Sequence, residues 1–148
     1  MSQVNAEARD RQKLQAIIEA RRLCKYSLHI LKSNENFKAY PTGDPEDDAK
    51  RPPQPELVAK LRETVLDIYI LAYSANDTPF TKGNYATRRR IQDKSVAKCR
   101  EFLALIELAA DVFHTPRKRV QYWTEKTVLV RNLIQAWKES DYRRYKRM

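Results

Sequence analysis

Apolar residues recur along most of the chain at alternating spacings of three and four, a period that predicts amphipathic helices. The clearest stripe lies near the C-terminus and consists of Val120, Trp123, Thr127, Val130, Ile134 and Trp137. A second stripe has the same spacing and consists of Val58, Leu61, Val65, Ile68, Ala72 and Ala75. Each stripe predicts one helical face turned toward a core.

Two further segments have the same helical pattern. One stripe consists of Ile91, Ser95, Cys99, Phe102, Ile106, Ala109 and Phe113, and the other of Leu14, Ile17, Arg21, Cys24, Leu28 and Leu31. Arg21 is the charged member of the last stripe. It either pairs with a buried carboxylate such as Asp67 or extends its head group to the surface.

Helix-breaking glycine and proline residues separate these stripes and set the expected bounds of the helices. The sequence has two glycines and seven prolines, and five of those prolines fall in an acidic loop expected over 36–54 and its edge. We expect helices at about 6–34, 55–76, 85–114 and 116–142, followed by a basic tail over 141–148. Short connections between four amphipathic helices predict one all-α domain over residues 1–148, an antiparallel four-helix bundle.

The second expected helix has an unusually wide apolar surface. Beside its main stripe it carries Leu66, Tyr69, Ile70 and Tyr73. One neighbouring helix does not cover a face of that width. These four residues therefore either belong to a central helix of the bundle or form an interface with a second molecule.

Basic residues exceed acidic residues and cluster in two regions. The 148-residue chain has 29 Lys and Arg against 19 Asp and Glu, a net charge of +10 that favours a polyanionic partner. Residues 82–100 contain seven basic residues and one acidic residue, and residues 115–148 contain ten and three. In an antiparallel pair, Arg88–Arg90 should lie near Arg143, Arg144, Lys146 and Arg147.

These cations predict a phosphate-binding surface, and a solvated surface that aids solubility is the alternative. The candidate nucleic-acid contacts are Arg88, Arg89, Arg90, Lys94, Lys98, Arg117, Lys118, Arg119, Arg143 and Arg144. Tyr85, Tyr142 and Tyr145 lie among them and are candidates for stacking on unpaired bases. Motifs for sequence-specific readout are absent, so we expect electrostatic, salt-sensitive and sequence-tolerant binding to RNA or cDNA.

Catalytic, metal and membrane motifs are absent from the sequence. It has no Walker loop, no GxSxG and no HExxH, and its two cysteines and two histidines lack metal-ligand spacing. We therefore expect no enzyme activity, no cofactor and no metal site. The N-terminus lacks an apolar signal region and no apolar run is long enough to span a membrane, so we expect a cytoplasmic protein.

Four stretches together resemble a known family. These are "NFKAYP" at 36–41, "AYSAND" at 72–77, "RRRIQDKSVAKCREFLALIELA" at 88–109 and "KRVQYWTEKTVLVRNLIQAWKESD" at 118–141. Their order and spacing resemble the accessory variability determinant proteins of diversity-generating retroelements, and the likeness covers roughly residues 14–141.

The resemblance implies a basic four-helix bundle that assembles as a homopentameric ring. It also implies a non-catalytic partner of the retroelement's reverse transcriptase, which acts with template-repeat RNA and cDNA in mutagenic retrohoming. Two alternatives stay open. One is a stand-alone basic protein that binds RNA or single strands. The other is a structural oligomeric module, like the related four-helix proteins encoded in intervening sequences of bacterial ribosomal RNA genes.

Overall fold

The chain forms long antiparallel helices. A computed structural model describes residues 3–32, 43–44, 46, 55–113 and 115–148, with side chains from Gln15 onward. In this part of the chain the helices are α1 (Gln3–Ile30), α3 (Pro55–Asp77), α4 (Tyr85–Val112) and α5 (Arg117–Lys146). The predicted all-α, four-helix architecture is confirmed. The expected loop at 36–54 lies almost wholly outside the described residues.

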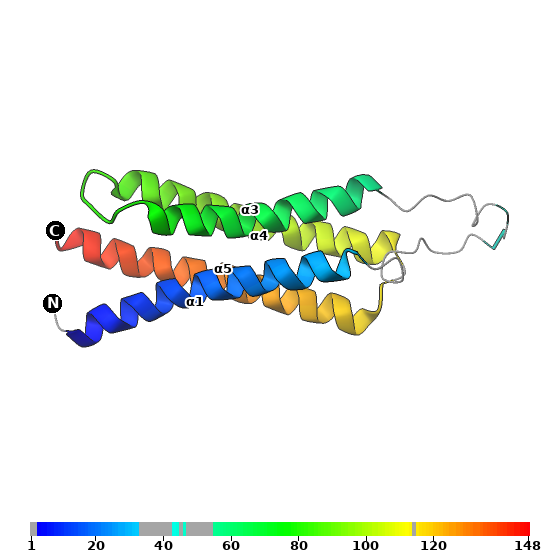
Figure 1. Ribbon diagram of the computed structural model, residues 1–148, viewed down its shortest axis with the longest axis horizontal. Coiled ribbons are helices and arrows are strands. Elements are labelled where there is room, and N and C mark those ends of the chain that lie inside the picture. The colour runs from blue at the N-terminus through cyan, green and yellow to red at the C-terminus, as the bar shows by residue number, and fades with distance from the viewer. Residues whose placement is uncertain (1–2, 33–42, 45, 47–54, 114) are drawn as a thin grey trace.

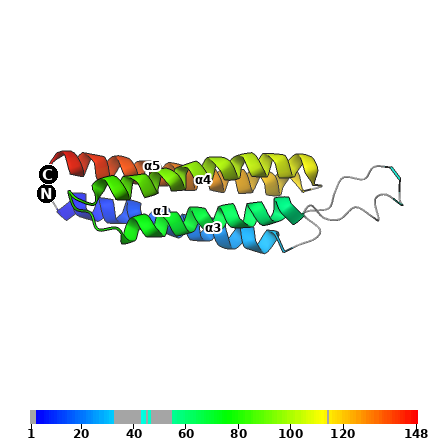
Figure 2. The same cartoon turned by 90° about the horizontal axis from the view of Figure 1, so that it is seen from above.

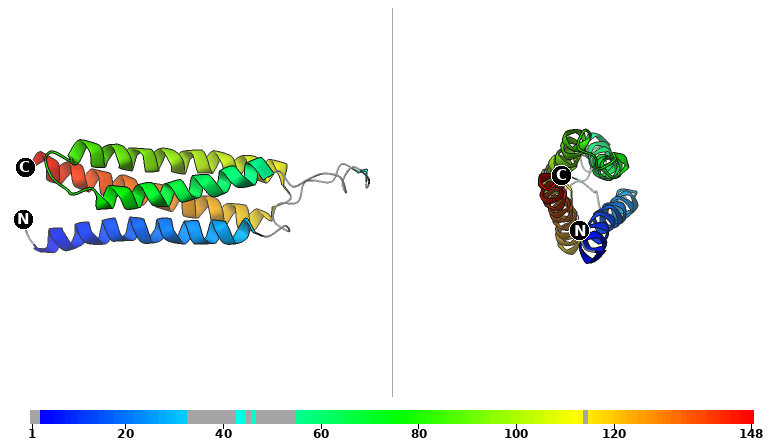
Figure 3. Two further views of the ribbon diagram at one scale, coloured as in Figure 1. Left: turned by 45° about the horizontal axis from the view of Figure 1, so that its top comes forward. Right: turned by 90° about the vertical axis from the view of Figure 1, so that its left-hand side faces the viewer.

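The helices pack around one shared core. Each contacts two neighbours: α1 packs against α3 and α5, and α4 packs against the same two helices from the opposite side. Both termini lie at the same end as the α3–α4 connection, and the α4–α5 turn lies at the other end (Figures 1 and 2). The view along the bundle shows the four helices arranged around a common centre (Figure 3). Residues distant in sequence are therefore brought together at each end.

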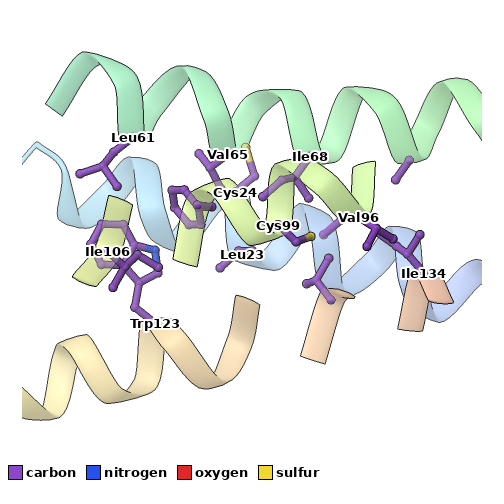
Figure 4. Close-up of a cluster of buried hydrophobic side chains, with 14 of the residues drawn as sticks. Leu23, Cys24, Leu61, Val65, Ile68, Val96, Cys99, Ile106, Trp123 and Ile134 are labelled. Atoms are coloured by element: carbon purple, nitrogen blue, oxygen red, sulfur yellow. The ribbon is translucent and has the colours of Figure 1, made fainter. Parts of the chain in front are cut away.

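The predicted stripes of α3, α4 and α5 face this core. Buried positions include Leu61, Val65 and Ile68 of α3, and Cys99 and Ile106 of α4. From α5, Trp123 and Ile134 enter the same cluster (Figure 4). The outermost predicted members Val58, Ile91 and Val120 are only partly buried and pack on the edge of the cluster. Heptad spacing thus identified the buried face of three helices correctly.

The buried face of α1 differs from the predicted stripe by about one residue. Its fully or nearly buried positions are Ala16, Ile17, Ala20, Leu23, Cys24, Ser27, Ile30 and Leu31. The small residues Ala16, Ala20 and Ser27 form the centre of this face, and Arg21 lies exposed beside it. The prediction that placed Arg21 on the core stripe was wrong, because small side chains contribute to a core as well as large ones.

Arg21 bonds to a tyrosine rather than to a carboxylate. Its Nε and Nη2 donate hydrogen bonds to the Tyr69 hydroxyl, at 3.3 Å and 3.1 Å. Asp67, the proposed carboxylate partner, instead lies 3.7 Å from the Lys98 ammonium. The head group of Arg21 therefore lies at the surface, as the second of the two sequence-based alternatives had it.

The bounds of α1 and α5 also differ from expectation. The last helix was expected to end at about residue 142, and it continues to Lys146, through most of the basic tail expected over 141–148. The final turn of this helix contains Arg143, Arg144 and Lys146. Positive charges at this position interact favourably with the negative end of the helix dipole. Near the N-terminus, α1 begins at Gln3 and ends at Ile30, so both of its bounds are earlier than the predicted 6 and 34.

Buried hydrogen bonds join neighbouring helices within the apolar core. The Trp123 indole donates to the Ser27 hydroxyl at 2.8 Å, which links α5 to α1. The Ser95 hydroxyl donates to the Ile68 carbonyl oxygen at 3.0 Å, which links α4 to α3. A buried polar group that lacks a partner is costly, so each bond favours one axial register of its helix pair.

The two cysteines are ordinary core residues. Cys24 and Cys99 are both buried with free thiols. Burial raises the pKa of Cys99 to about 12 and also raises the pKa of Cys24. Neither thiol is therefore an activated nucleophile.

Replacing Phe102 with alanine should strongly destabilise the bundle. Phe102 is fully buried and its ring meets Trp123 edge to face at 5.4 Å between centroids. The resulting cavity should lower the free energy of unfolding by about 3–5 kcal/mol. Leu108→Ala is the matched control on the same helix, because Leu108 is 49% exposed and its loss should cost within about 0.5 kcal/mol. Urea denaturation measures both, and equal losses would contradict this description of the core.

Candidate nucleic-acid interface

A buried ion pair closes the end of the bundle where α4 begins and α5 ends. The Arg88 guanidinium donates from Nε to Asp141 Oδ2 at 2.8 Å and from Nη2 to Oδ1 at 3.4 Å. Gln92 donates a further bond to Oδ2 at 3.0 Å. The remaining Arg88 nitrogen, Nη1, donates to the Thr78 carbonyl oxygen at 2.9 Å. Both charges are thus satisfied inside the protein.

The sequence-based assignment of Arg88 to the nucleic-acid surface is therefore wrong. The residue is only 4% exposed, and its guanidinium lies over the rings of Phe80 and Trp137, at 5.5 Å and 5.2 Å from their centroids. A phosphate group cannot reach a cation that is enclosed in this way. Arg88 instead fixes α5 and the α3–α4 connection against α4.

The neighbouring Arg89 lies nearer the surface. Its Nη1 donates to the Tyr85 hydroxyl at 2.9 Å, and its guanidinium lies 5.5 Å from the centre of the Tyr142 ring. The hydrogen bond to Tyr85 raises the pKa of Arg89, so this side chain stays cationic. These contacts hold the charge in place at the end of the bundle.

The tyrosines of this end are already engaged within the protein. The Tyr85 and Tyr145 rings stack on each other, with centroids 3.9 Å apart and planes 7° from parallel. The Tyr142 ring has the Arg89 guanidinium and the Lys146 ammonium at 5.5 Å and 5.1 Å from its centroid. These three rings therefore position cations and join α4 to α5, and the expectation that they stack on bases lacks support here.

The last turns of α5 bring more cations to the same end. The Arg144 guanidinium carbon lies 3.4 Å from the centre of the Phe80 ring, which also contacts Arg88. Arg143 is exposed and its Nε lies 3.9 Å from Glu139. Arg90 and Lys94 of α4 are exposed as well. The predicted proximity of Arg88–Arg90 to the C-terminal cations is thus confirmed.

The charge at this end is strongly unbalanced. Residues 76–94 and 135–148 together contain ten Lys and Arg and four Asp and Glu. Three of the four carboxylates already have cationic partners within the group: Asp141 pairs with Arg88, Asp93 with Lys138, and Glu139 with Arg143. We call the cations at the surface of this end the basic end, and they are Arg89, Arg90, Lys94, Arg143, Arg144, Lys146 and Arg147.

Lys98 does not belong to the basic end, although the sequence suggested it as a contact. Its ammonium lies 3.1 Å from Glu101 and 3.7 Å from Asp67, on the side of α4 that faces α3. The hydrogen bond with Glu101 raises the pKa of Lys98 and lowers that of Glu101. Local carboxylates compensate this charge, so we remove Lys98 from the candidate interface.

The remaining candidate cations lie at the opposite end of the bundle. Arg117, Lys118 and Arg119 form the first turn of α5, next to the α4–α5 turn. On α5, Arg119 and Arg143 are the nearest members of the two groups, and they are 24 residues or about 36 Å apart at ~1.5 Å per residue. The ten predicted contacts are therefore not one continuous surface.

The candidate interface on α3 is partly exposed. Ile70 is 54% and Tyr73 46% exposed, whereas Leu66 and Tyr69 are half-buried against the edge of the core. The Tyr69 and Tyr73 rings lie 6.1 Å apart between centroids. Leu66 and Tyr69 therefore serve the bundle itself, and Ile70 and Tyr73 remain as an apolar surface.

Sequence reasoning missed the residues that enclose Arg88. Phe80 lies in the α3–α4 connection, Gln92 on the core face of α4, and Asp141 on the core face of α5. The sequence did contain one signal. Asp141 lies four residues after Trp137, at the next position of the α5 stripe, and Arg88 and Gln92 continue the α4 stripe in the N-terminal direction from Ser95. A charged residue at a core position of each antiparallel helix, at the same end, indicates a buried pair.

Within the ranges that the structure describes, no group of three or more His, Cys, Asp and Glu side chains is arranged to hold a metal ion. The same ranges contain no helix whose length and apolar character would suit a membrane crossing.

Comparisons of the chain with protein-family models, with curated proteins and with solved structures found no match. The resemblance to the accessory variability determinant proteins thus rests on the four sequence stretches quoted above.

Replacing Asp141 with alanine should leave Arg88 buried without its counter-charge. The free energy of unfolding should fall by about 3–5 kcal/mol, because an unpaired buried charge is severely unfavourable. Glu139→Ala, which removes an exposed carboxylate two residues away, should cost within about 0.5 kcal/mol. The double variant R88M/D141L should recover most of the stability. Urea denaturation of the three variants tests the pair, and a mild effect of D141A would show that the pair is not structural.

Proposed function

We propose that this protein binds the phosphate backbone of nucleic acid through its basic end. The observation that carries the proposal is the charge imbalance at the junction of α4 and α5. Ten cationic residues meet four carboxylates there, and three of those carboxylates are already paired. A polyanion relieves the repulsion among the remaining surface cations and releases its own counterions on binding.

The proposed binding is tolerant of sequence. The cations of the basic end sit near helix ends, and no helix among the described residues projects past the bundle to enter a groove. Phosphate contacts position a nucleic acid without reading its bases. Affinity should therefore depend strongly on salt and weakly on base composition.

We further propose that this nucleic acid is the template RNA and cDNA of a diversity-generating retroelement, and that the protein is the non-catalytic partner of its reverse transcriptase. The support is the sequence resemblance, together with the four-helix bundle and the basic end. In this proposal, copies of the chain assemble as a ring and each contributes one basic end, so modest contacts add through effective concentration. Ile70 and Tyr73 supply apolar surface for that assembly or for the polymerase.

One specific observation favours a second candidate function. The exposed Ile70 and Tyr73 suit a structural oligomeric module of the ribosomal intervening-sequence type, in which basic residues only aid solubility. That module would lack affinity for nucleic acid at moderate salt. Measuring binding to a single-stranded RNA at such salt distinguishes the two functions.

Removing two cations from the basic end should flatten the salt dependence of RNA binding. In the variant R89A/R90A, the slope of log K against log salt should fall by about 0.7–0.9 for each phosphate that the protein no longer neutralises. Fluorescence anisotropy over a range of salt concentrations measures the slope.

The matched control for that experiment is K60A/R62A, which removes the same charge from α3, away from the basic end. Its slope should equal that of the wild type. If both variants flatten the slope equally, the protein responds to total charge and the basic end is not the site.

The partnership with a polymerase has a separate test. The proposal requires a reverse transcriptase encoded beside this chain, and that enzyme should be retained on the immobilised protein at moderate salt after nuclease treatment. Retention that disappears with nuclease would show that RNA bridges the two proteins. No retention at all would overturn the retroelement proposal and leave nucleic-acid binding as a property of the bundle alone.

A further inference from the structure

A small hollow lies between α1 and α5, away from the basic end. Its lining residues are Glu19, Arg22, Leu23, Tyr26, Tyr122 and Lys126, and its volume is about 40 Å³. The floor is apolar, since Leu23 is buried in the core. Two aromatic rings, two cations and one carboxylate therefore line one shallow depression.

The rings in this hollow form a corner. Tyr26 of α1 and Tyr122 of α5 meet edge to face, with centroids 4.9 Å apart and planes at 62°. Tyr122 is 45% exposed, whereas Tyr26 is half-buried. A flat ring placed against Tyr122 would therefore stack on one tyrosine while its edge meets the other.

Three cations and one carboxylate lie around the corner. The Lys126 ammonium lies 5.4 Å from the centre of the Tyr122 ring. Burial raises the pKa of the Tyr26 hydroxyl, and the positive charge of Arg119 partly opposes that rise. Arg22 also lines the hollow, and its Nη1 binds Glu19 at 2.8 Å. Arg117 and Lys118 lie one to two turns earlier on α5 than Tyr122.

Tyr122 differs from the tyrosines of the basic end in what it already contacts. Tyr85 and Tyr145 stack on each other, and two cations lie within 5.5 Å of the centre of Tyr142. Tyr122 has one edge contact with Tyr26 and one cation, and it borders a hollow. Of these rings it is therefore the one best placed to accept a further aromatic group.

We propose that the corner formed by Tyr26 and Tyr122 holds one unpaired nucleobase of a bound strand, with Lys126 and Arg119 beside its phosphates. This inference rests on the proposed function, because it specifies single-stranded nucleic acid as the ligand class. The hollow is smaller than a base, so the base lies on the Tyr122 ring with its other face toward solvent. Stacking of this kind is tolerant of base identity, because every base has a flat aromatic face.

Two protein forms and two ligands test the proposal as a double-mutant cycle. The proteins are the wild type and Y122A, and the ligands are a short oligothymidylate and a strand of the same length built of abasic residues. Both strands carry the same phosphates, so the basic end treats them alike. Fluorescence anisotropy at one moderate salt concentration gives all four dissociation constants, and circular dichroism checks that Y122A is folded.

Wild type should bind the oligothymidylate more tightly than the abasic strand, and Y122A should abolish that difference. The affinity for the oligothymidylate should fall by about 5- to 150-fold, the usual effect of removing one stacking ring. Y122F keeps the ring and should stay within about twofold of the wild type.

The remaining outcomes separate the two levels of the proposal. Equal wild-type affinity for both strands, or a fall in Y122A affinity that is the same for both, would overturn the base site and leave phosphate binding intact. Failure of the wild type to bind either strand would overturn the proposed function, and the base site with it.

Discussion

The buried pair of Arg88 and Asp141 is the interaction on which the rest of this arrangement depends. Two opposite charges from α4 and α5 meet at 2.8 Å under Phe80 and Trp137, and the same guanidinium holds the carbonyl oxygen of Thr78. The Arg88 side chain thus joins α4 to α5 and to the segment that connects α3 with α4. Sliding either helix by one turn would leave a charge in the core without a partner, at a cost of several kcal/mol. That constraint fixes which surface cations of α4 stand beside those of α5.

Polar contacts of this kind join each pair of neighbouring helices, and the contacts differ in burial. Trp123 to Ser27 and Ser95 to the Ile68 carbonyl are buried, as is the charged pair. The bond from Arg21 to Tyr69, between α1 and α3, is exposed. An apolar stripe alone tolerates changes of register, because leucine and valine pack acceptably in several positions. Directional bonds at buried sites remove that freedom, so we attribute the register of the four helices mainly to them.

The sequence predicted the fold well because heptad spacing, rare glycine and clustered proline all agree on four helices. The buried faces of α3, α4 and α5 followed from the spacing of large apolar residues. The buried face of α1 did not follow from this spacing, because the small residues Ala16, Ala20 and Ser27 occupy its centre. A stripe drawn through the large residues alone included Arg21, which lies exposed beside that face. The site was harder to predict. Arg88, Arg89 and Arg90 are identical in the sequence, yet the 100° turn between successive residues places the first in the core and the others toward the surface. Lys98 is distinguished only by carboxylates on two helices, which a linear count of charge does not reveal.

The charge of Arg88 is neutralised inside the bundle, whereas the charges of its neighbours face outward. This difference can be measured as the salt dependence of single-stranded RNA binding for the wild type and for R88M/D141L, which leaves the net charge unchanged. Because Arg88 is expected to bind no phosphate, the two slopes of log K against log salt should coincide. A slope reduced by about 0.7 in the double variant, the value expected when one phosphate of a single strand is no longer neutralised, would show instead that Arg88 binds phosphate.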